Sequence, residues 1–265
     1  MSVSLSDHCT KGYRLPGELS GEMITIGSFK TYFRKSSSST ESEPSKKALV
    51  LFTDIFGLTI PNTQLNGDRL GQSLDVDVYV PDLFEGKPLV SQEDMGPFTV
   101  HQPGVTLSFK QQLGRAWALL KRLPHLRREI TNRPGAVKRR GEAFIKALKE
   151  AKHYDRIGIV GYCFGGGVAI HVAATDLVDT IVIIHPSLTS REEVARIRDM
   201  WISAATREQY EGVLRAKLEA QDFEIQVYPG TTHGFAVRPN LEIPEVKQAY
   251  EGALQQTTKW LQEKL

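Results

Sequence analysis

The sequence is poor in cysteine, in excess charge of either sign and in long apolar runs. Its two cysteines, Cys9 and Cys163, allow at most one disulfide, which excludes a disulfide-stabilised scaffold. With 33 Lys and Arg against 31 Asp and Glu, the net charge of +2 gives no general attraction to nucleic acid or membranes. No stretch approaches the roughly 18 apolar residues of a membrane span, and the N-terminus lacks a signal-peptide pattern. We therefore expect a soluble, cytoplasmic protein whose thiols are free.

Six short apolar runs are separated by segments of helical periodicity, a pattern typical of parallel strands that are covered on both faces. This alternation predicts an α/β fold with a doubly wound, mainly parallel sheet and helices on both faces, formed by the whole chain as a single domain. The predicted strands cover residues 48–52, 76–80, 156–160, 180–184, 200–205 and 223–228, and the predicted helices cover about 61–74, 141–153, 165–175, 208–221 and 245–264.

Two segments depart from this alternation. Residues 1–47 are interpreted as an N-terminal extension or hairpin, in which the serine-rich stretch from Ser36 to Pro44 forms an exposed loop or a short linker. Residues from about 102 to 140 form a basic helical insertion. The insertion could cover the site and attract anionic substrates, or could contact nucleic acid. Because the chain is nearly neutral, a solvated pair of helices is the simpler interpretation.

The segment GYCFG, residues 161–165, lies between a predicted strand and a predicted helix. Its spacing is that of a nucleophile elbow, a strained turn whose flanking glycines avoid collisions with the helix and the neighbouring strands. Cys163 then replaces the usual serine as the nucleophile, and its place at a helix N-terminus favours the thiolate. The backbone N–H of Phe164 is the expected oxyanion donor. A buried, unreactive cysteine is the alternative.

A histidine follows the last predicted strand in the sequence PGTTHGF, residues 229–235. In hydrolases of this architecture the triad follows the order nucleophile, acid, histidine, so His233 is the expected base for the thiol proton. His185 and His171 are the alternatives. His185 ends a predicted strand and could line the cleft, whereas His171 falls within the helix after the elbow.

The acid that orients the histidine should follow the strand that ends near residue 205. Glu208 occupies this place, although a glutamate is also favoured at the start of a helix. Asp199 and Asp222 are the alternatives.

A further carboxylate follows the first strong strand in the sequence FTDIFG, residues 52–57. The backbone N–H of Ile55 could provide the second oxyanion donor, since that role needs only backbone geometry. Asp54 either contacts the thiol or caps a turn. Both residues are expected at the lip of the site, because ligands bind at the carboxyl ends of parallel strands.

Together these stretches resemble the dienelactone hydrolase family of α/β-hydrolases, in particular its fungal members. The resemblance covers most of the chain from about Ala48 and implies an α/β-hydrolase fold. It also implies carboxymethylenebutenolidase-like hydrolysis of lactones or esters by a Cys-acid-His triad through an acyl-cysteine, without metal or organic cofactor. The matching segments are TDIFG at 53–57, VPDLF at 80–84, GYCFGG at 161–166, HP at 185–186 and HGF at 233–235.

The resemblance also implies individual roles. Asp54 stands where the family has an acidic residue, usually glutamate, that hydrogen-bonds the resting thiol and takes part in its activation. Glu208 stands where the family usually has the triad aspartate. Arg238 is the counterpart of an arginine that binds the substrate carboxylate in the bacterial enzymes, with one residue more in the spacing. Further candidates for substrate binding are Tyr162, Phe56 and His185.

The sequence therefore predicts a hydrolase of a small-molecule ester or lactone, as a monomer or homodimer with no nucleic-acid or membrane partner. Two other functions stay open. The chain could be a catalytically retired α/β-hydrolase that acts as a binding module, because its acid loop departs from the family pattern. It could also be a redox-active cysteine protein, for which Cys9 is the only available partner.

Overall fold

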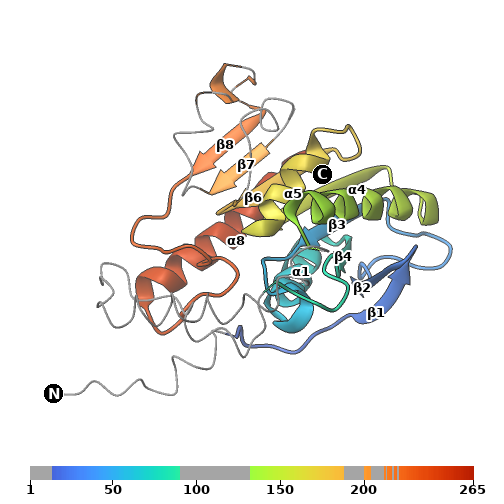
Figure 1. Cartoon of the computed structure of the whole chain (residues 1–265), viewed down its shortest axis with the longest axis horizontal. Helices are drawn as coiled ribbons and strands as arrows, with labels where there is room; N and C mark the ends of the chain where they lie inside the picture. Colours follow the sequence, from blue (N-terminus) through green and yellow to red (C-terminus); the bar gives the residue numbers. More distant parts are fainter. Residues whose placement is uncertain are drawn as a thin grey trace.

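A central sheet organises the computed structural model, and within the described residues it has eight strands in the order β1-β2-β4-β3-β5-β6-β7-β8 (Figure 1). β1 and β2 form an antiparallel hairpin, and β2 is also antiparallel to β4. All pairs from β4 to β8 are parallel. The structure describes residues 14–89, 132–187, 200–203, 212, 214–216, 218–219 and 221–265.

The strands and helices have the following bounds. The strands are β1 (Glu22–Ile26), β2 (Phe29–Arg34), β3 (Lys47–Phe52), β4 (Asp77–Pro81), β5 (Arg156–Tyr162), β6 (Thr180–Ile184), β7 (Met200–Ser203) and β8 (Phe223–Gln226). The helices are the short 3-10 helix η2 (Gly57–Thr59), α1 (Asn62–Leu74), α4 (Pro134–Ala151), α5 (Phe164–Ala173) and α8 (Pro244–Lys264).

Successive residues of the central strands pack against helices on opposite faces of the sheet. Val50 and Phe52 of β3 belong to a core with residues of α4 and α5, whereas Leu49 and Leu51 belong to a core with residues of α1 and α8 (Figure 1). This alternation follows from the two-residue period of a strand. The predicted doubly wound, mainly parallel sheet with helices on both faces is thereby confirmed.

The described strands and most described helix starts agree closely with the prediction, and the start of α4 is the main difference. β5 continues to Tyr162, past the predicted end at Val160. α4 begins at Pro134 instead of residue 141, because proline is well suited to the first position of a helix. Of the predicted helix 208–221 only a few positions are described, with helical backbone at residues 212, 214 and 215. None of the described helices combines the length and apolarity that a bilayer span requires.

The hairpin β1–β2 was not identified as two strands because its sequence lacks a continuous apolar run. β1 lies at the edge of the sheet and is mostly exposed, so polar residues are tolerated there. The serine-rich stretch that follows β2 is also largely exposed, but Ser36 is buried. Its N–H donates to Asp77 Oδ1 at 2.8 Å and its hydroxyl to Asp75 Oδ1 at 2.8 Å. These bonds attach the stretch to the turn between α1 and β4.

Most of the basic insertion, residues 102–131, lies outside the described residues. Its last part, residues 132–140, leads into α4. Arg140 there donates to the carbonyl oxygen of Leu83 at 3.0 Å and pairs with Glu85 at 3.1 Å. The start of α4 is therefore tied to the loop after β4.

The turn between β5 and α5 has no room for added side-chain atoms. A Cβ at Gly165 would overlap the carbonyl oxygens of Phe52 and Thr53, and a Cβ at Gly161 would overlap the carbonyl oxygen of Gly165. These neighbours are backbone atoms, so they cannot move aside as a flexible side chain would.

We predict that Gly165→Ala lowers the free energy of unfolding by about 3 kcal/mol, the upper part of the usual range for overpacking. Urea denaturation measures this difference. Gly135→Ala is the matched control, because a Cβ there meets only the Arg139 side chain at 3.6 Å, and it should leave stability nearly unchanged. Equal stability of the two variants would contradict the predicted overlap.

Candidate active site

Cys163 links β5 to α5 in a conformation that residues other than glycine rarely adopt, with φ 54° and ψ −113°. Three backbone hydrogen bonds hold it there. Its N–H donates to Ile184 O at 3.0 Å, and its carbonyl oxygen accepts from Gly166 N and Ser187 N, each at 3.0 Å. Two of the three reach the end of β6, so the neighbouring strand stabilises the strained turn. This is the geometry expected of a nucleophile elbow.

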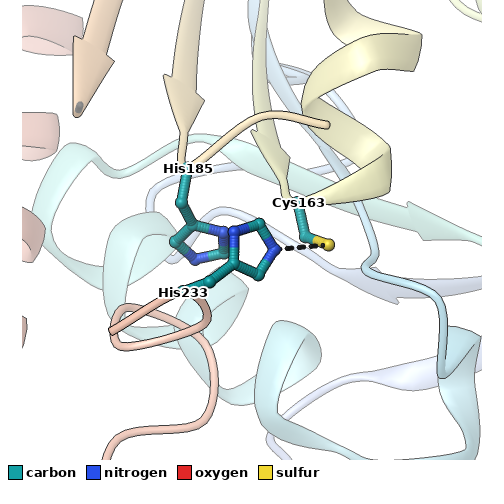
Figure 2. A group of neighbouring side chains, drawn as sticks. All are labelled: Cys163, His185 and His233. Carbon is teal, nitrogen blue, oxygen red and sulfur yellow. Dashed lines mark hydrogen bonds between the residues drawn. The ribbon is translucent and has the colours of Figure 1, made fainter. Parts of the chain in front are cut away.

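His233 lies opposite the elbow, on the loop between β8 and α8. Its Nε2 is 3.0 Å from Cys163 Sγ, within the distance at which a base takes a proton (Figure 2). Cys163 is buried, with 6% of its surface exposed, whereas His233 is exposed. The structure therefore brings together the predicted nucleophile and base, and leaves the base open to solvent.

The thiol and the imidazole of this pair are both neutral at rest. Burial, and then the Asp54 carboxylate, raise the pKa of Cys163 to about 11, although Ser187 and the Phe164 N–H act in the opposite direction. Burial, and then Arg238, lower the pKa of His233 below its usual value. The helix N-terminus favours the thiolate through the Phe164 N–H, as expected, but desolvation outweighs this donated N–H and the net pKa of the resting thiol is raised.

Asp54 forms a buried ion pair with Arg238. The Arg238 Nε donates to Asp54 Oδ2 at 2.9 Å, and the side chains are only 4% and 10% exposed for Asp54 and Arg238. The other carboxylate oxygen accepts from Phe56 N at 3.1 Å, so Asp54 also caps the turn after β3. Burial raises the pKa of Asp54, while Arg238 and the Phe56 N–H oppose this. Asp54 influences Cys163 through its charge.

Arg238 is held on its other side by an aromatic ring. Its guanidinium carbon lies 4.6 Å from the centre of the Phe56 ring, a cation–π contact. Phe56 itself is buried, with 1% of its surface exposed. Of the predicted substrate-binding residues, Arg238 and Phe56 thus form one unit with Asp54 beside the elbow.

His185 follows β6 directly and lies beside His233. The two ring centres are 4.8 Å apart (Figure 2). His185 is 2% exposed, and neither of its ring nitrogens has a hydrogen-bond partner among the described residues. Burial, and then the charges of His233 and Arg238, hold its pKa well below the usual value, so the ring is neutral. Its ring also contacts Phe235 at 5.9 Å between centres.

The remaining histidine and tyrosine candidates lie away from the reacting atoms. His171 Nε2 is 3.2 Å from Glu142 Oε2 on α4, so it does not serve Cys163. Tyr162 is buried in the core that includes residues of α1 and α8, and its hydroxyl accepts from Asn66 at 3.3 Å. Tyr162 therefore packs in the core directly before the elbow, and this position does not favour the prediction that it binds substrate.

Of the three candidate acids, Asp222 lies within the described residues. Glu208 and Asp199 lie outside the described residues. Asp222 directly precedes β8, whereas His233 follows the other end of that strand, so the strand separates the two. Asp222 also pairs with Lys264 at 3.5 Å. Asp222 is therefore excluded as the acid that orients His233.

The two predicted oxyanion donors flank the elbow. Phe164 directly follows Cys163 as the first residue of α5, and its backbone N–H contacts the Cys163 sulfur. Ile55 lies in the turn that Asp54 caps, and its side chain is half-buried. Their joint use in binding an oxyanion stays a prediction.

The sequence analysis missed residues that position the histidine loop and the elbow. Asn62 and Asn66, one turn apart on α1, donate to the carbonyl oxygens of Val237 at 2.8 Å and Ala236 at 3.0 Å. Buried asparagines in a helix are unfavourable by propensity, which is the signal that could have identified them. Ser187, whose Oγ lies 3.9 Å from Cys163 Sγ, was also missed.

Comparisons with known proteins agree with this geometry. Residues 35–265 match the family model described as the dienelactone hydrolase family. A carboxymethylenebutenolidase homolog of Xenopus tropicalis is 26% identical, with 96% of this chain and 94% of that protein covered. Hydrolase pyvD of Aspergillus violaceofuscus is 26% identical, with 100% and 98% covered. Dienelactone hydrolase from Anabaena variabilis has a TM-score of 0.55 at 14% identity, with 92% and 97% covered, which shows the α/β-hydrolase fold.

We predict that Asp54→Asn makes Cys163 easier to ionise, because the substitution removes a nearby negative charge and frees the positive charge of Arg238. In a Cys9→Ser background, the rate of iodoacetamide alkylation follows the thiolate fraction. The parent protein should react slowly at neutral pH, with a midpoint near pH 11. The midpoint of Asp54→Asn should be lower.

The exposed Asp155 provides the matched control. Asp155→Asn changes the net charge equally, and its midpoint should equal that of the parent. A common midpoint for all three proteins would show that Asp54 does not raise the pKa of the thiol.

Proposed function

The chain belongs to the dienelactone hydrolase family and is a carboxylic ester or lactone hydrolase, and from this premise we propose that it acts through a Cys163 acyl-enzyme with His233 as the base. The observation that carries the proposal is the 3.0 Å distance between Cys163 Sγ and His233 Nε2. The strained backbone at Cys163 supports it independently, because such strain is typical of presented nucleophiles.

In the proposed acylation, the proton moves from Cys163 Sγ to His233 Nε2 as the sulfur attacks the substrate carbonyl carbon. The neutral thiol–imidazole pair fits this step, because a neutral imidazole can accept a proton and the thiol still carries one. The N–H groups of Ile55 and Phe164 hold the oxyanion. The carbonyl re-forms, the bond to the leaving oxygen breaks, and His233 gives its proton to that oxygen.

Deacylation reverses the roles of the same atoms. Water attacks the thioester while His233 takes its proton, the carbon–sulfur bond then breaks, and His233 gives the proton to Cys163 Sγ as the carboxylic acid leaves. In our proposal Glu208 orients the imidazole and offsets the positive charge that forms on it in both steps. Every step uses side chains and backbone groups of this chain alone.

The substrate class that fits best is an ester or lactone that carries a carboxylate. Arg238 provides the reason, because its guanidinium is buried beside the elbow and is bound to a carboxylate, Asp54. A substrate carboxylate has the same chemistry and could compete for this partner. Loss of Arg238 from Asp54 would let the buried acid take up a proton from solvent, and the loss of its negative charge would make Cys163 easier to ionise. His185 would then border the acyl group.

Two alternative functions are less well supported. A redox role requires an accessible, easily ionised thiol, whereas Cys163 is buried and its pKa is raised to about 11. A retired binding module does not need a nucleophile and a base at reacting distance. Action as a monomer or homodimer in the cytoplasm, without nucleic-acid or membrane partners, remains part of the proposal.

We predict that Cys163→Ala lowers kcat/KM by about 10⁴-fold or more, as expected for the loss of a catalytic nucleophile. p-Nitrophenyl acetate and a panel of neutral and carboxylate-bearing lactones provide the assay. Cys9→Ala is the matched control and should keep the activity. Turnover retained by Cys163→Ala would refute the mechanism, and the absence of turnover by the parent on every substrate would favour the binding module.

We predict that Glu208→Gln lowers kcat by about 10³–10⁴-fold, because an uncharged partner neither fixes the imidazole tautomer nor offsets the charge on His233. The exposed Glu219 offers the control. Glu219→Gln should behave as the parent in the same esterase assay. Near-normal rates for Glu208→Gln would move the role of the acid to Asp199, since Asp222 is excluded by its place before β8.

A further inference from the structure

Beyond hydrolysis, we propose that Cys163, His185 and His233 form a site for Zn²⁺ that holds the thiol in an inactive state. One ligand atom of each side chain lies within 4.8 Å of the others (Figure 2). Binding of Zn²⁺ at this site does not depend on the proposed function, whereas the inhibition of catalysis by Zn²⁺ rests on that function. The proposed reaction requires no metal, so a bound Zn²⁺ would be an inhibitor.

His185 is the residue that points to a ligand. It is 2% exposed, and both of its ring nitrogens lack hydrogen-bond partners among the described residues. A buried polar atom without a partner is unfavourable, and hydrolysis as proposed gives His185 no proton to move. A metal ion bound between the three side chains would accept the lone pair of the nearer ring nitrogen of His185.

The ligand set selects the metal. One thiolate and two imidazoles match the sulfur and nitrogen donors that Zn²⁺ prefers, whereas Mg²⁺ and Ca²⁺ prefer oxygen. Three protein ligands leave a fourth tetrahedral position for water. Among the described residues Ser187 Oγ, 3.9 Å from Cys163 Sγ, lies close enough to hydrogen-bond such a water.

The local charges permit a cation. Arg238 is the nearby positive group, but its guanidinium is paired with Asp54 at 2.9 Å, which offsets it. His233 is exposed, which gives the ion an approach from solvent to the buried sulfur.

Binding of Zn²⁺ at this site releases one proton. Zn²⁺ displaces the proton of the Cys163 thiol, forms one bond to sulfur and two to imidazole nitrogen, and the proton passes to the solvent. The lone pairs that His233 Nε2 and Cys163 Sγ would use for catalysis then belong to the metal. A chelator reverses the reaction and restores the thiol.

Co²⁺ is a suitable probe, because it takes the place of Zn²⁺ and a thiolate ligand gives it a charge-transfer band. We expect the untagged full chain to bind one equivalent of Co²⁺ with this band, and Zn²⁺ to displace it. Cys163→Ser should remove the band. His185→Gln should weaken binding by more than about tenfold, since even partners outside the ligand shell contribute ~10–100-fold.

His171→Gln is the matched control, because His171 is another histidine on a neighbouring element and it pairs with Glu142. It should bind Co²⁺ as the parent does. His233→Gln changes an exposed ligand and should also weaken binding by more than about tenfold, and it protects the test against misfolding of the buried His185 variant.

Two results would overturn the site: no charge-transfer band at saturating Co²⁺, or parent affinity in both His185→Gln and His233→Gln. These spectra require no turnover, so they separate the metal site from the hydrolytic mechanism. If Cys163→Ala retains esterase activity, the mechanism fails while the Co²⁺ spectra still decide the site. Where the parent is active, its inhibition constant for Zn²⁺ should equal the dissociation constant from the Co²⁺ competition.

Discussion

The site depends on the buried ion pair between Asp54 and Arg238. It joins the loop after β3 to the loop after β8, which are far apart in the sequence but meet at the carboxyl edge of the sheet. Removal of one partner would leave an uncompensated buried charge, at a cost of about 3–5 kcal/mol. The pair therefore fixes the loop that carries His233. Its negative end raises the pKa of Cys163, and its positive end lowers that of His233.

A neutral thiol beside a neutral imidazole has consequences for both stability and selectivity. A buried thiolate–imidazolium pair would have to compensate for the desolvation of two charges, which seldom gives a net gain. The neutral pair avoids that cost and keeps the sulfur a poor nucleophile toward adventitious electrophiles. In the proposed mechanism the Cys163 thiol must then be activated when substrate binds. A substrate carboxylate that replaces Asp54 as the partner of Arg238 would provide this activation. In the proposed mechanism the reactive state is thereby confined to the time when substrate is present.

Sequence patterns indicated that Cys163 and His233 meet, because strand order fixes which loops lie together. The GYCFG turn placed Cys163 at one strand end, and the terminal strand placed His233 at another. The net rise in the pKa of Cys163 was not predicted, because burial depends on packing that no local pattern encodes. The pairing of Asp54 with Arg238, and the bonds from Asn62 and Asn66, join distant segments through side-chain geometry alone. Glu208 lies outside the described residues, so its role remains a prediction.

His185 shows how packing and function can be separated at one residue. Its neighbours Tyr162, Phe235 and His233 form a largely aromatic environment in which a phenylalanine or leucine would be at least as stable. An imidazole with two unpartnered nitrogens is therefore unfavourable for the fold, and its positive φ of 40° adds backbone strain. Both costs fall on a residue whose ring nitrogen lies within 4.8 Å of ligand atoms of Cys163 and His233. Chemistry at that point, rather than packing, accounts for a histidine at residue 185.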